Sequence, residues 1–443
     1  MKILVVGAGP AGLTMGATLA RRGHRVTAVD RDPGPAPDGT WRRRGVMQFG
    51  HAHGFRPQVR DLLVREWPEA WDAWVGLGAE PVVLGPPGAD GPLAVRSRRQ
   101  TYERALRAAA AGVAGLDVRT GTVDRLVERG GRVTGAVVDG AGVDADLVVV
   151  ASGRASRITA GGDDLGGDTG IAYVNRTYRL RPGAEPGPLT MPTAWAGVFD
   201  GYMTLVFVHE RGHFSVVLVR PTADAALRVL RHRDAFDAAC RAIPDLAVWT
   251  DPARATPTSD VSIGGRLLNV YRRPRPVPGL VPVGDAVSTT APTAGRGVAM
   301  VSLQCAEILR LLDGGADAAT IAEPFGAWCD AEIRPWVEDH LACDGEAAAR
   351  WQGADIDLSH PLTSAAIVAA APADPAIGPH VGGYLAMVAP PASLAPAEPL
   401  ARAVYASGWR APFSAGPTRD ELVDLLRDRG AGGASPWLER RAG

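Results

Sequence analysis

The sequence predicts an α/β protein that combines a parallel β-sheet with an inserted antiparallel sheet and a helical C-terminal region. Residues 3–30 read as strand, helix and strand, residues 171–220 as four strands joined by short turns, and residues 316–443 as helices with proline-rich breaks. The expected units are residues 1–160 with 266–315, the inserted sheet at 161–265, and the helical region at 316–443.

The first unit begins with a glycine pattern between two apolar strands. An apolar run at residues 3–6 is followed by Gly7, Gly9 and Gly12, then by a helical pattern and a second strand that ends at Asp30. Glycine at these positions permits a tight turn, close approach of a pyrophosphate, and close packing of the helix on the strand. The helix N-terminus favours phosphate charge, and Asp30 is placed to accept hydrogen bonds from a ribose hydroxyl. The pattern indicates a Rossmann-type dinucleotide site, and the alternative is a glycine-rich turn without a ligand.

The composition is that of a globular protein of 443 residues, 46% of them hydrophobic and 21% charged. The formal net charge of −1 provides no basic field for nucleic acid. Lys2 is the only lysine, which excludes mechanisms that need a catalytic lysine elsewhere. The four cysteines, Cys240, Cys305, Cys329 and Cys343, lack zinc-ligand spacing, so we expect free intracellular thiols and no metal site. No apolar run reaches the roughly 18 residues of a membrane span, and we expect a cytoplasmic protein.

Arginines recur close to the expected nucleotide. Residues 42–44 are three consecutive arginines in a polar connector, although a solvated basic loop would have the same composition. Residues 54–78 and 98–111 have helical patterns. Arg99 stands at the start of the second helix, from where its side chain can reach back to a cofactor.

Strand patterns follow at residues 116–119, 122–128, 133–138 and 146–150. A turn at residues 139–142 predicts that the last two of these form a hairpin-like return. Because residues 146–150 are almost wholly apolar and lead into a glycine, we also expect this strand to rejoin the parallel sheet.

The inserted sheet is the expected wall for a substrate, with strands at residues 171–180, 194–200, 203–209 and 213–220. Tyr202, Phe207 and Phe214 lie on this sheet, and strand alternation directs some of them toward the cleft. His51 and His53, in the segment H-A-H-G-F, are further pocket candidates. Each of these histidines could instead be a surface residue or a hydrogen-bonded core residue.

A second glycine-rich segment lies at residues 280–312. An apolar strand ends in Gly284 and Asp285, and a loop with Pro292, Gly295 and Gly297 leads into a long apolar helix. A carboxylate at a strand end can bind a polyol or ribityl hydroxyl, and the glycine-rich helix start offers N–H groups to a pyrophosphate or a ring carbonyl. Since about 270 residues separate the two segments, we expect one extended ligand to bridge them.

Three motifs follow one another in the chain: the first glycine pattern with Asp30, the Gly284-Asp285 pair, and the loop from Pro292 to Val298. With these motifs in this order, residues 1–312 resemble the FAD-dependent monooxygenases of the para-hydroxybenzoate hydroxylase fold, especially bacterial branches with epoxidases and hydroxylases of secondary metabolism. The resemblance implies that the first segment binds the AMP half of FAD, that Asp285 binds the ribityl chain, and that the second loop approaches the flavin ring. The residues it implies at the cofactor are Gly7, Gly9, Pro10, Ala11, Gly12, Asp30, Arg31, Arg43, Arg44, Arg99, Val123, Gly284, Asp285, Pro292, Gly295, Gly297 and Val298.

Two positions depart from the family pattern. Ser152-Gly153 stands where the family has Asp-Gly, and Val287-Ser288 replaces the usual residues after the Gly-Asp-Ala of the second segment. The chain contains a single G-x-G-x-x-G, so a separate NAD(P)H domain is not expected. Electrons would come from transiently bound NAD(P)H or from a partner flavin reductase.

The resemblance implies a monooxygenase that activates O₂ as a C4a-(hydro)peroxyflavin and hydroxylates or epoxidises an organic small molecule. The cofactor carries this chemistry, which agrees with a sequence that assigns no catalytic side chain. The main alternative is an FAD-dependent reductase or dehydrogenase of a polyprenyl-like or other apolar substrate. A flavin-dependent halogenase is disfavoured because its lysine and its W-x-W-x-I-P segment are absent, and a flavoprotein that only holds FAD is a further alternative.

Overall fold

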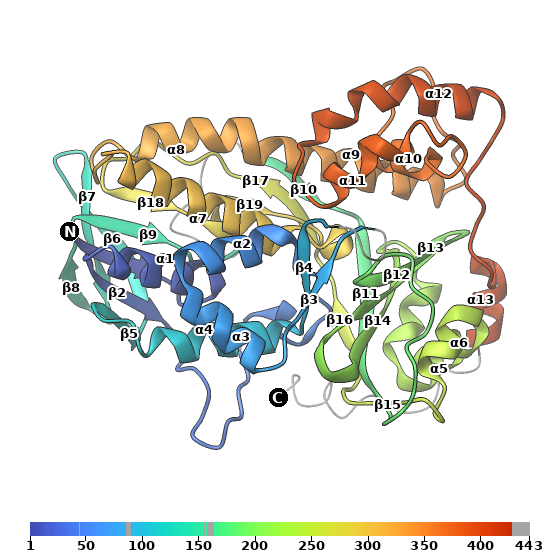
Figure 1. Cartoon of the computed structure of the whole chain (residues 1–443), viewed down its shortest axis with the longest axis horizontal. Coiled ribbons are helices and arrows are strands. Elements are labelled where there is room, and N and C mark those ends of the chain that lie inside the picture. The colour runs from blue at the N-terminus through green and yellow to red at the C-terminus, as the bar shows by residue number, and fades with distance from the viewer. Residues whose placement is uncertain (44, 86–89, 155, 157–163, 428–443) are drawn as a thin grey trace.

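The computed structural model describes the chain except residues 44, 86–89, 155, 157–163 and 428–443 (Figure 1). Its centre is a five-stranded sheet in the order β18-β9-β1-β2-β5, with every neighbouring pair parallel. The strands are β18 (Leu280–Pro282), β9 (Leu147–Val150), β1 (Lys2–Val6), β2 (Arg25–Asp30) and β5 (Leu116–Thr120). β9 is buried along its whole length, as expected for a parallel strand covered on both faces.

Helices cover one face of this sheet and an antiparallel meander covers the other (Figure 1). The helices are α1 (Pro10–Arg21), α4 (Arg99–Ala110) and α7 (Gly297–Asp313), and the meander is β6 (Val123–Arg129), β7 (Arg132–Val138) and β8 (Ala141–Asp144). Leu4 and Val6 of β1 pack against Val133 of β7, whereas Ile3 and Val5 face the helices. This alternation follows from the two-residue period of a strand.

The expected pairing of residues 133–138 with 146–150 is wrong. β7 pairs with β8, which begins inside the predicted turn at residues 139–142 and continues to Asp144. β9 instead joins the parallel sheet between β1 and β18, so the expected return to that sheet is confirmed. A strand as apolar as β9 is buried more completely in the centre of a sheet than at the edge of a hairpin.

The second large sheet is antiparallel and follows the order β12-β13-β14-β11-β15, with β16 also paired to β11. Its strands are β12 (Ala194–Phe199), β13 (Tyr202–Val208), β14 (His213–Pro221), β11 (Ile171–Leu180), β15 (Ala255–Pro257) and β16 (Ser262–Gly264). One face packs against α5 (Arg233–Ala242), α6 (Pro244–Thr250) and α13 (Arg419–Leu426), as Figure 1 shows. The other face is turned toward the parallel-sheet part of the molecule.

A three-stranded sheet joins the two parts. β10 (Leu165–Asp168) pairs with β17 (Leu268–Tyr271), which pairs with β19 (Ser288–Thr289). β10 lies in the stretch that the sequence analysis placed in the inserted sheet, but its partner β17 leads into the second glycine-rich segment. The two connections to the inserted sheet are therefore held together by hydrogen bonds.

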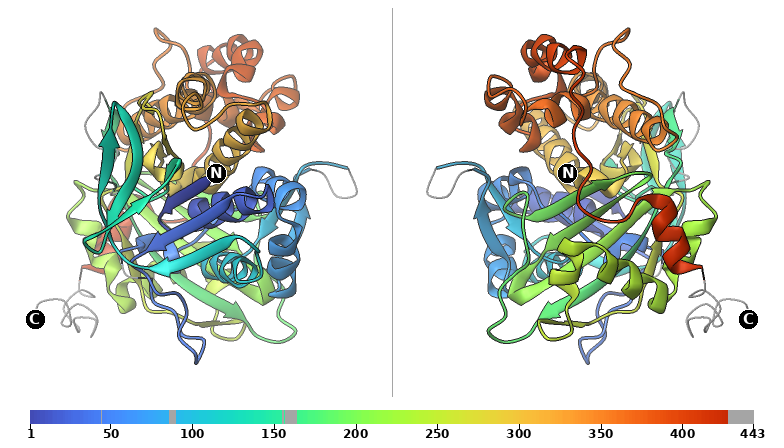
Figure 2. Two further views of the ribbon diagram at one scale, coloured as in Figure 1. Left: turned by 90° about the vertical axis from the view of Figure 1, so that its left-hand side faces the viewer. Right: turned by 90° about the vertical axis from the view of Figure 1, so that its right-hand side faces the viewer.

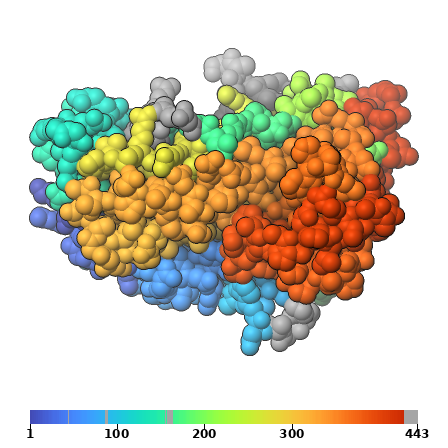
Figure 3. Space-filling model, turned by 90° about the horizontal axis from the view of Figure 1, so that it is seen from above, coloured from blue at the N-terminus to red at the C-terminus, as the bar shows by residue number. Residues whose placement is uncertain are grey.

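The C-terminal region is helical, as predicted. It contains α8 (Ala322–Trp328), α9 (Arg334–Arg350), α10 (Ser364–Ala370), α11 (Gly378–Leu385), α12 (Glu398–Ala406) and α13. The helices α8 to α12 contribute to the same apolar core as α7 and spread over the face seen in Figure 3. α13 instead crosses to the antiparallel sheet, where Leu422 and Leu426 are buried beside α5 (Figure 2).

The helix expected at residues 54–78 is two helices, α2 (Pro57–Glu66) and α3 (Pro68–Gly76). Proline disfavours the helical conformation in the residue before it, and Trp67 has φ −150° and ψ 65°. The hairpin of β3 (Glu80–Val83) and β4 (Leu93–Arg96) follows. Within the described ranges, no helix has both the length and the apolar character needed to cross a membrane.

Candidate functional site

The first glycine-rich turn connects β1 to α1 and leaves an open surface above Gly9. A Cβ atom on Gly7, which has φ +103°, would lie 2.5 Å from the Ala151 carbonyl oxygen. One on Gly12 would lie 1.8 Å from the Gly7 carbonyl oxygen, so glycine is required at both positions for packing. On Gly9 the nearest atom would be Arg43 Nη1 at 3.5 Å. Because no side chain caps the first turn of α1, its N–H groups are available to a phosphate above Gly9.

A buried charge network lies beside this turn. Asp30, at the end of β2, accepts hydrogen bonds from Ala8 N–H at 2.7 Å and from Arg43 Nη2 at 3.1 Å. Arg43 and Arg99 both donate to Glu103, whose side chain is only 2% exposed. The structure thus brings together three predicted residues, Asp30, Arg43 and Arg99. Glu103 was missed, although its position four residues after Arg99 on a helix was a usable signal.

The other residues expected near the adenine end are placed less closely. Arg31 is exposed and its guanidinium packs against Gly45. Val123 begins β6 two residues after Gly121, whose N–H donates to the Asp30 carbonyl at 2.9 Å, so it lies near the end of β2. Arg44 lies outside the described residues.

The second glycine-rich segment packs directly against the first. A Cβ atom on Gly284, which has φ +72°, would lie 3.1 Å from the Ala11 side chain at the start of α1. The Gly284 N–H donates to Gln304 Oε1 at 2.7 Å, and Gln304 Nε2 donates to Ser288 Oγ at 3.1 Å. Ser288, where the sequence departs from the family pattern, is therefore part of the support for this turn.

The Asp285 carboxylate differs from that of Asp30 in its hydrogen bonding and its pKa. Among the described residues, none donates a hydrogen bond to it, and burial raises its pKa. The positive charges of Arg99, Arg154 and Arg272 oppose that rise. Asp285 is half-buried, and a carboxylate partly withdrawn from water without donors favours a ligand with hydroxyl groups, as the ribityl chain of FAD has.

The loop after Asp285 faces the segment that contains both candidate histidines. Gly295, at the end of the turn Pro292–Ala294, has φ +62°, and a Cβ atom on it would lie 3.7 Å from Gly54 Cα. A Cβ atom on Gly54 would in turn lie 3.6 Å from the Phe207 ring. Gly297 begins α7, and Val298 packs into the core beside α4. Phe207 is therefore the aromatic candidate that the structure brings to this end of the site.

His51 and His53 are both held as neutral rings. His51 Nδ1 and the Tyr173 hydroxyl are 2.7 Å apart, and burial lowers the pKa of His51 to about 4. Arg99 Nη1 and His53 Nε2 are 3.0 Å apart. Since a guanidinium can only donate, Nε2 is the acceptor, and the proton of the neutral His53 ring resides on Nδ1. Burial, together with the charge of Arg99, lowers the pKa of His53 well below its ordinary value. Neither ring is a cation at neutral pH.

The inserted sheet contributes polar residues that were not predicted. Asn175 Oδ1 accepts from Ala52 N–H at 3.2 Å, and His209 Nε2 lies 2.9 Å from Ser215 Oγ. Tyr173 and Asn175 are two apart on β11 and share the face turned toward the cofactor segments. Their period-two spacing was a usable signal, but the sequence does not reveal which face of the strand is turned inward.

Tyr202 and Phe214 lie on the opposite face of the inserted sheet, so the prediction of these two rings as pocket residues is wrong. Tyr202 stacks on Phe199 with ring centroids 4.7 Å apart, and its hydroxyl donates to the Pro417 carbonyl. Phe214 stacks on Tyr178 in the same core under α5 and α6. Phe207 is five residues after Tyr202 on β13, so alternation places these two rings on opposite faces.

Comparisons with known proteins agree with this architecture. Residues 1–191 match the family model of pyridine nucleotide-disulphide oxidoreductases. A 67-residue stretch is 47% identical to a D-amino acid dehydrogenase of Rhizobium johnstonii, but it spans only 15% of this chain and 16% of that relative. Among solved structures, the flavin-dependent brominase Bmp2 superposes on this chain with a TM-score of 0.64 at 15% identity, covering 92% of this chain and 99% of that one.

A further solved structure, the probable FAD-dependent monooxygenase PqsL from Pseudomonas aeruginosa, superposes with a TM-score of 0.61 at 15% identity, covering 80% of this chain and 98% of that one. At such identity the superpositions establish the fold alone. The chain has the α/β fold of FAD-dependent oxidoreductases, as the sequence predicted. The fold and the family match together support an FAD-dependent oxidoreductase.

Proposed function

We propose that this protein is an FAD-dependent monooxygenase that uses O₂ to hydroxylate or epoxidise an organic small molecule. The observation that carries the proposal is the continuity of the site: Gly284 packs on the start of α1, Gly295 faces Gly54, and Gly54 faces Phe207. A ligand that bridges both glycine-rich segments would thus end at the inserted sheet. Bound FAD would supply the redox chemistry and the activation of O₂.

Specific residues would hold the adenosine and pyrophosphate portions. Asp30 would accept from ribose hydroxyls, and Gly9 with the first turn of α1 would face the pyrophosphate. Arg99, Arg154 and Arg272 act electrostatically on Asp285, although Arg99 is also paired with Glu103 and Arg272 with Asp164. The Asp285 carboxylate would bind ribityl hydroxyls.

The ring end is neutral and largely apolar. The loop at residues 291–296 is called the ring-side loop. Leu205, Phe207 and Val217 of the inserted sheet pack in one cluster with Ala291 of this loop and with Met47. His51 and His53 are uncharged there. Such surroundings exclude water from the reacting atoms, which supports transfer of oxygen to an apolar substrate. We assign residues 161–265 to substrate binding, with β10 grouped instead with its partner β17.

The alternative is an FAD-dependent reductase or dehydrogenase acting on a polyprenyl-like or other apolar substrate. The same apolar cluster favours it, and the local similarity to a dehydrogenase is compatible with it.

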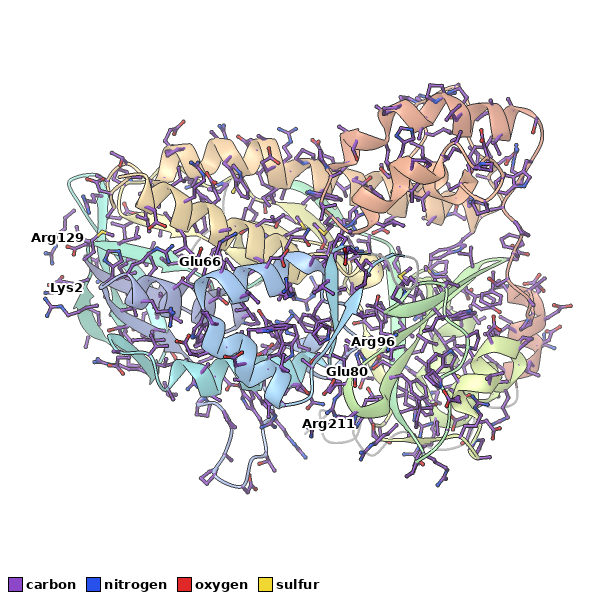
Figure 4. All side chains as sticks on the ribbon, in the orientation of Figure 1. Lys2, Glu66, Glu80, Arg96, Arg129 and Arg211 are labelled. Carbon is purple, nitrogen blue, oxygen red and sulfur yellow. The ribbon has the colours of Figure 1, made fainter. Side chains whose placement is uncertain are left out.

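Halogenation finds less support, because Lys2 begins β1 at the end of the sheet opposite Gly7 and stands at the outer edge of the molecule in Figure 4. The electron source would be NAD(P)H or a partner flavin reductase, and the protein would act in secondary metabolism in the cytoplasm.

Rapid mixing tests the proposal. The FAD-loaded protein is reduced without oxygen, mixed with O₂, and followed by visible absorbance with and without candidate apolar substrates. We expect a transient species distinct from reduced and oxidised flavin, and a product heavier by one oxygen atom. Direct return to oxidised flavin with every substrate, together with oxygen-independent turnover, would favour the dehydrogenase. The Lys2→Ala variant serves as a control and should behave as wild type.

A further inference from the structure

The ring-side loop, residues 291–296, is connected by hydrogen bonds to the C-terminal helices. Ala291 N–H donates to Asn269 Oδ1 at 2.7 Å, and Asn269 Nδ2 donates to Asp344 of α9 at 2.8 Å. Arg56 donates both to the Ala294 carbonyl and to the Leu385 carbonyl at the end of α11. Two separate bridges therefore connect the loop to α9 and α11.

The third connection is a buried ion pair at the end of the loop. Arg296 Nη1 lies 2.6 Å from Asp339 Oδ2 of α9, and the Tyr384 hydroxyl of α11 donates to the same oxygen at 2.7 Å. The guanidinium lies 4.7 Å from the centre of the Trp336 ring and 4.6 Å from that of Tyr384. Both members of the ion pair have side chains only 5% exposed. Removal of either one would leave a buried charge uncompensated.

We propose that Arg296, Asp339 and Tyr384 are positioning residues that fix the ring-side loop against Gly54 and thereby determine how the flavin ring is held. The loop needs such anchors because its own side chains offer little packing. Thr293 and Ala294 are small, and Gly295, which faces Gly54, has no side chain. The identity of the ligand rests on the proposed function, whereas the anchoring of the loop does not. The C-terminal region, to which the sequence analysis assigned no chemistry, thus takes part in shaping the site.

The test uses Asp339→Leu, the milder Asp339→Asn, and hydrogen–deuterium exchange of the FAD-free protein. In Asp339→Leu we expect the amides of residues 291–297 to exchange at least about tenfold faster, because opening of the loop no longer breaks the buried ion pair. Bound FAD should dissociate about tenfold more readily and show a shifted visible spectrum. Asp339→Asn keeps an oxygen acceptor for Arg296 and Tyr384 but removes the negative charge, so it should change both properties in the same direction by a smaller factor.

Asp355→Leu is the matched control, because Asp355 pairs with Arg410 on the surface of the same helical region. It should leave exchange and spectrum at wild-type values. If Asp339→Leu does not fold, Tyr384→Phe removes one hydrogen bond and should change exchange in the same direction by a smaller factor. Unchanged exchange and spectrum in folded Asp339 variants, or equal changes in the Asp355 control, would overturn the proposal. Since exchange is measured without FAD, failure of oxygen transfer would not be mistaken for failure of the anchoring.

Discussion

The two glycine-rich segments are stabilised by different means. In the first, the tight contacts of Gly7 and Gly12 lie within the β1-α1 unit or at Ala151 and Ser152, just after the neighbouring strand β9. In the second, the turn at Gly284 needs Gln304, and the loop at Gly295 needs partners on β17, just before α2, and on α9, where Tyr384 of α11 supports Asp339. The first segment consequently depends mainly on contacts within its own βαβ unit, with one long-range contact of Gly7 at Ala151, whereas the second depends largely on long-range packing.

Their electrostatic surroundings differ as well. The first segment lies beside Asp30, Arg43 and Glu103, which form a connected set of buried charges. In the second, Asp285 is under the charges of Arg99, Arg154 and Arg272, whereas the loop at residues 291–296 lies beside the segment of His51 and His53, which are neutral. Neutral rings are thus confined to the loop, where a ring and an apolar substrate would meet.

The largest expected effect comes from Gly12→Ala. A Cβ atom would lie 1.8 Å from the Gly7 carbonyl oxygen, and backbone cannot move aside cheaply. We expect a loss of at least about 3 kcal/mol of unfolding free energy, the upper range for overpacking, measured by urea denaturation. Gly50→Ala, where no atom lies within 4 Å of the added carbon, is the matched control. Equal stability of both variants would contradict the proposed packing of the first segment.

Asp285→Asn should weaken FAD binding and stabilise the FAD-free protein. Loss of hydrogen bonds to a charged acceptor corresponds to about 10- to 100-fold in the dissociation constant. Burial raises the pKa of Asp285, so ionisation disfavours the folded FAD-free state, and this cost grows as the pH rises from the unfolded pKa of 3.8 through the folded pKa. Thermal midpoints of the FAD-free variant should exceed those of wild type at pH 7, and the two should converge in acid. A lower midpoint at pH 7 would show that the carboxylate has an internal partner.

The buried neutral histidines predict an acid-dependent loss of stability on the ring side. Burial lowers the pKa of His51 from 6.5 to about 4, so its stabilising contribution is present above pH 6.5 and is lost as the pH falls toward 4. The loss from this group is up to about 3 kcal/mol. Replacement His51→Gln should flatten the dependence of unfolding free energy on pH between 6.5 and 4. An unchanged slope would mean that His51 titrates normally in the folded protein.

The smallest effect is expected away from both segments. Arg21 of α1 and Glu69 of α3 form an exposed pair at 2.8 Å. Exposed pairs contribute little, so Glu69→Gln should change the unfolding free energy by about 0.5 kcal/mol or less and leave FAD affinity unchanged. A large effect on FAD affinity would reveal coupling between the surface of α1 and its N-terminus.

Local patterns explain which features the sequence predicted. The glycine spacing, Asp30 and the four long strands β11 to β14 of the inserted sheet are encoded within short stretches, and the structure contains each of them. The inward face of the sheet was not predictable, since alternation groups Tyr202 with Phe214 but does not say which side faces the site. The anchoring of Arg296 by Asp339 was also inaccessible, because it joins residues 43 apart through tertiary packing.

The most direct test of the account concerns Gly9, where a side chain would meet the ligand rather than the protein. The added carbon of Gly9→Ala has its nearest atom at 3.5 Å, and φ is −78°, so the unfolding free energy of the FAD-free protein should change by no more than about 1 kcal/mol. Titration of the FAD-free variant with FAD, followed by flavin fluorescence, should show a dissociation constant at least about tenfold higher than that of wild type, since the methyl group occupies the path of the pyrophosphate. Wild-type affinity in a normally stable Gly9→Ala protein would contradict the placement of FAD on this turn.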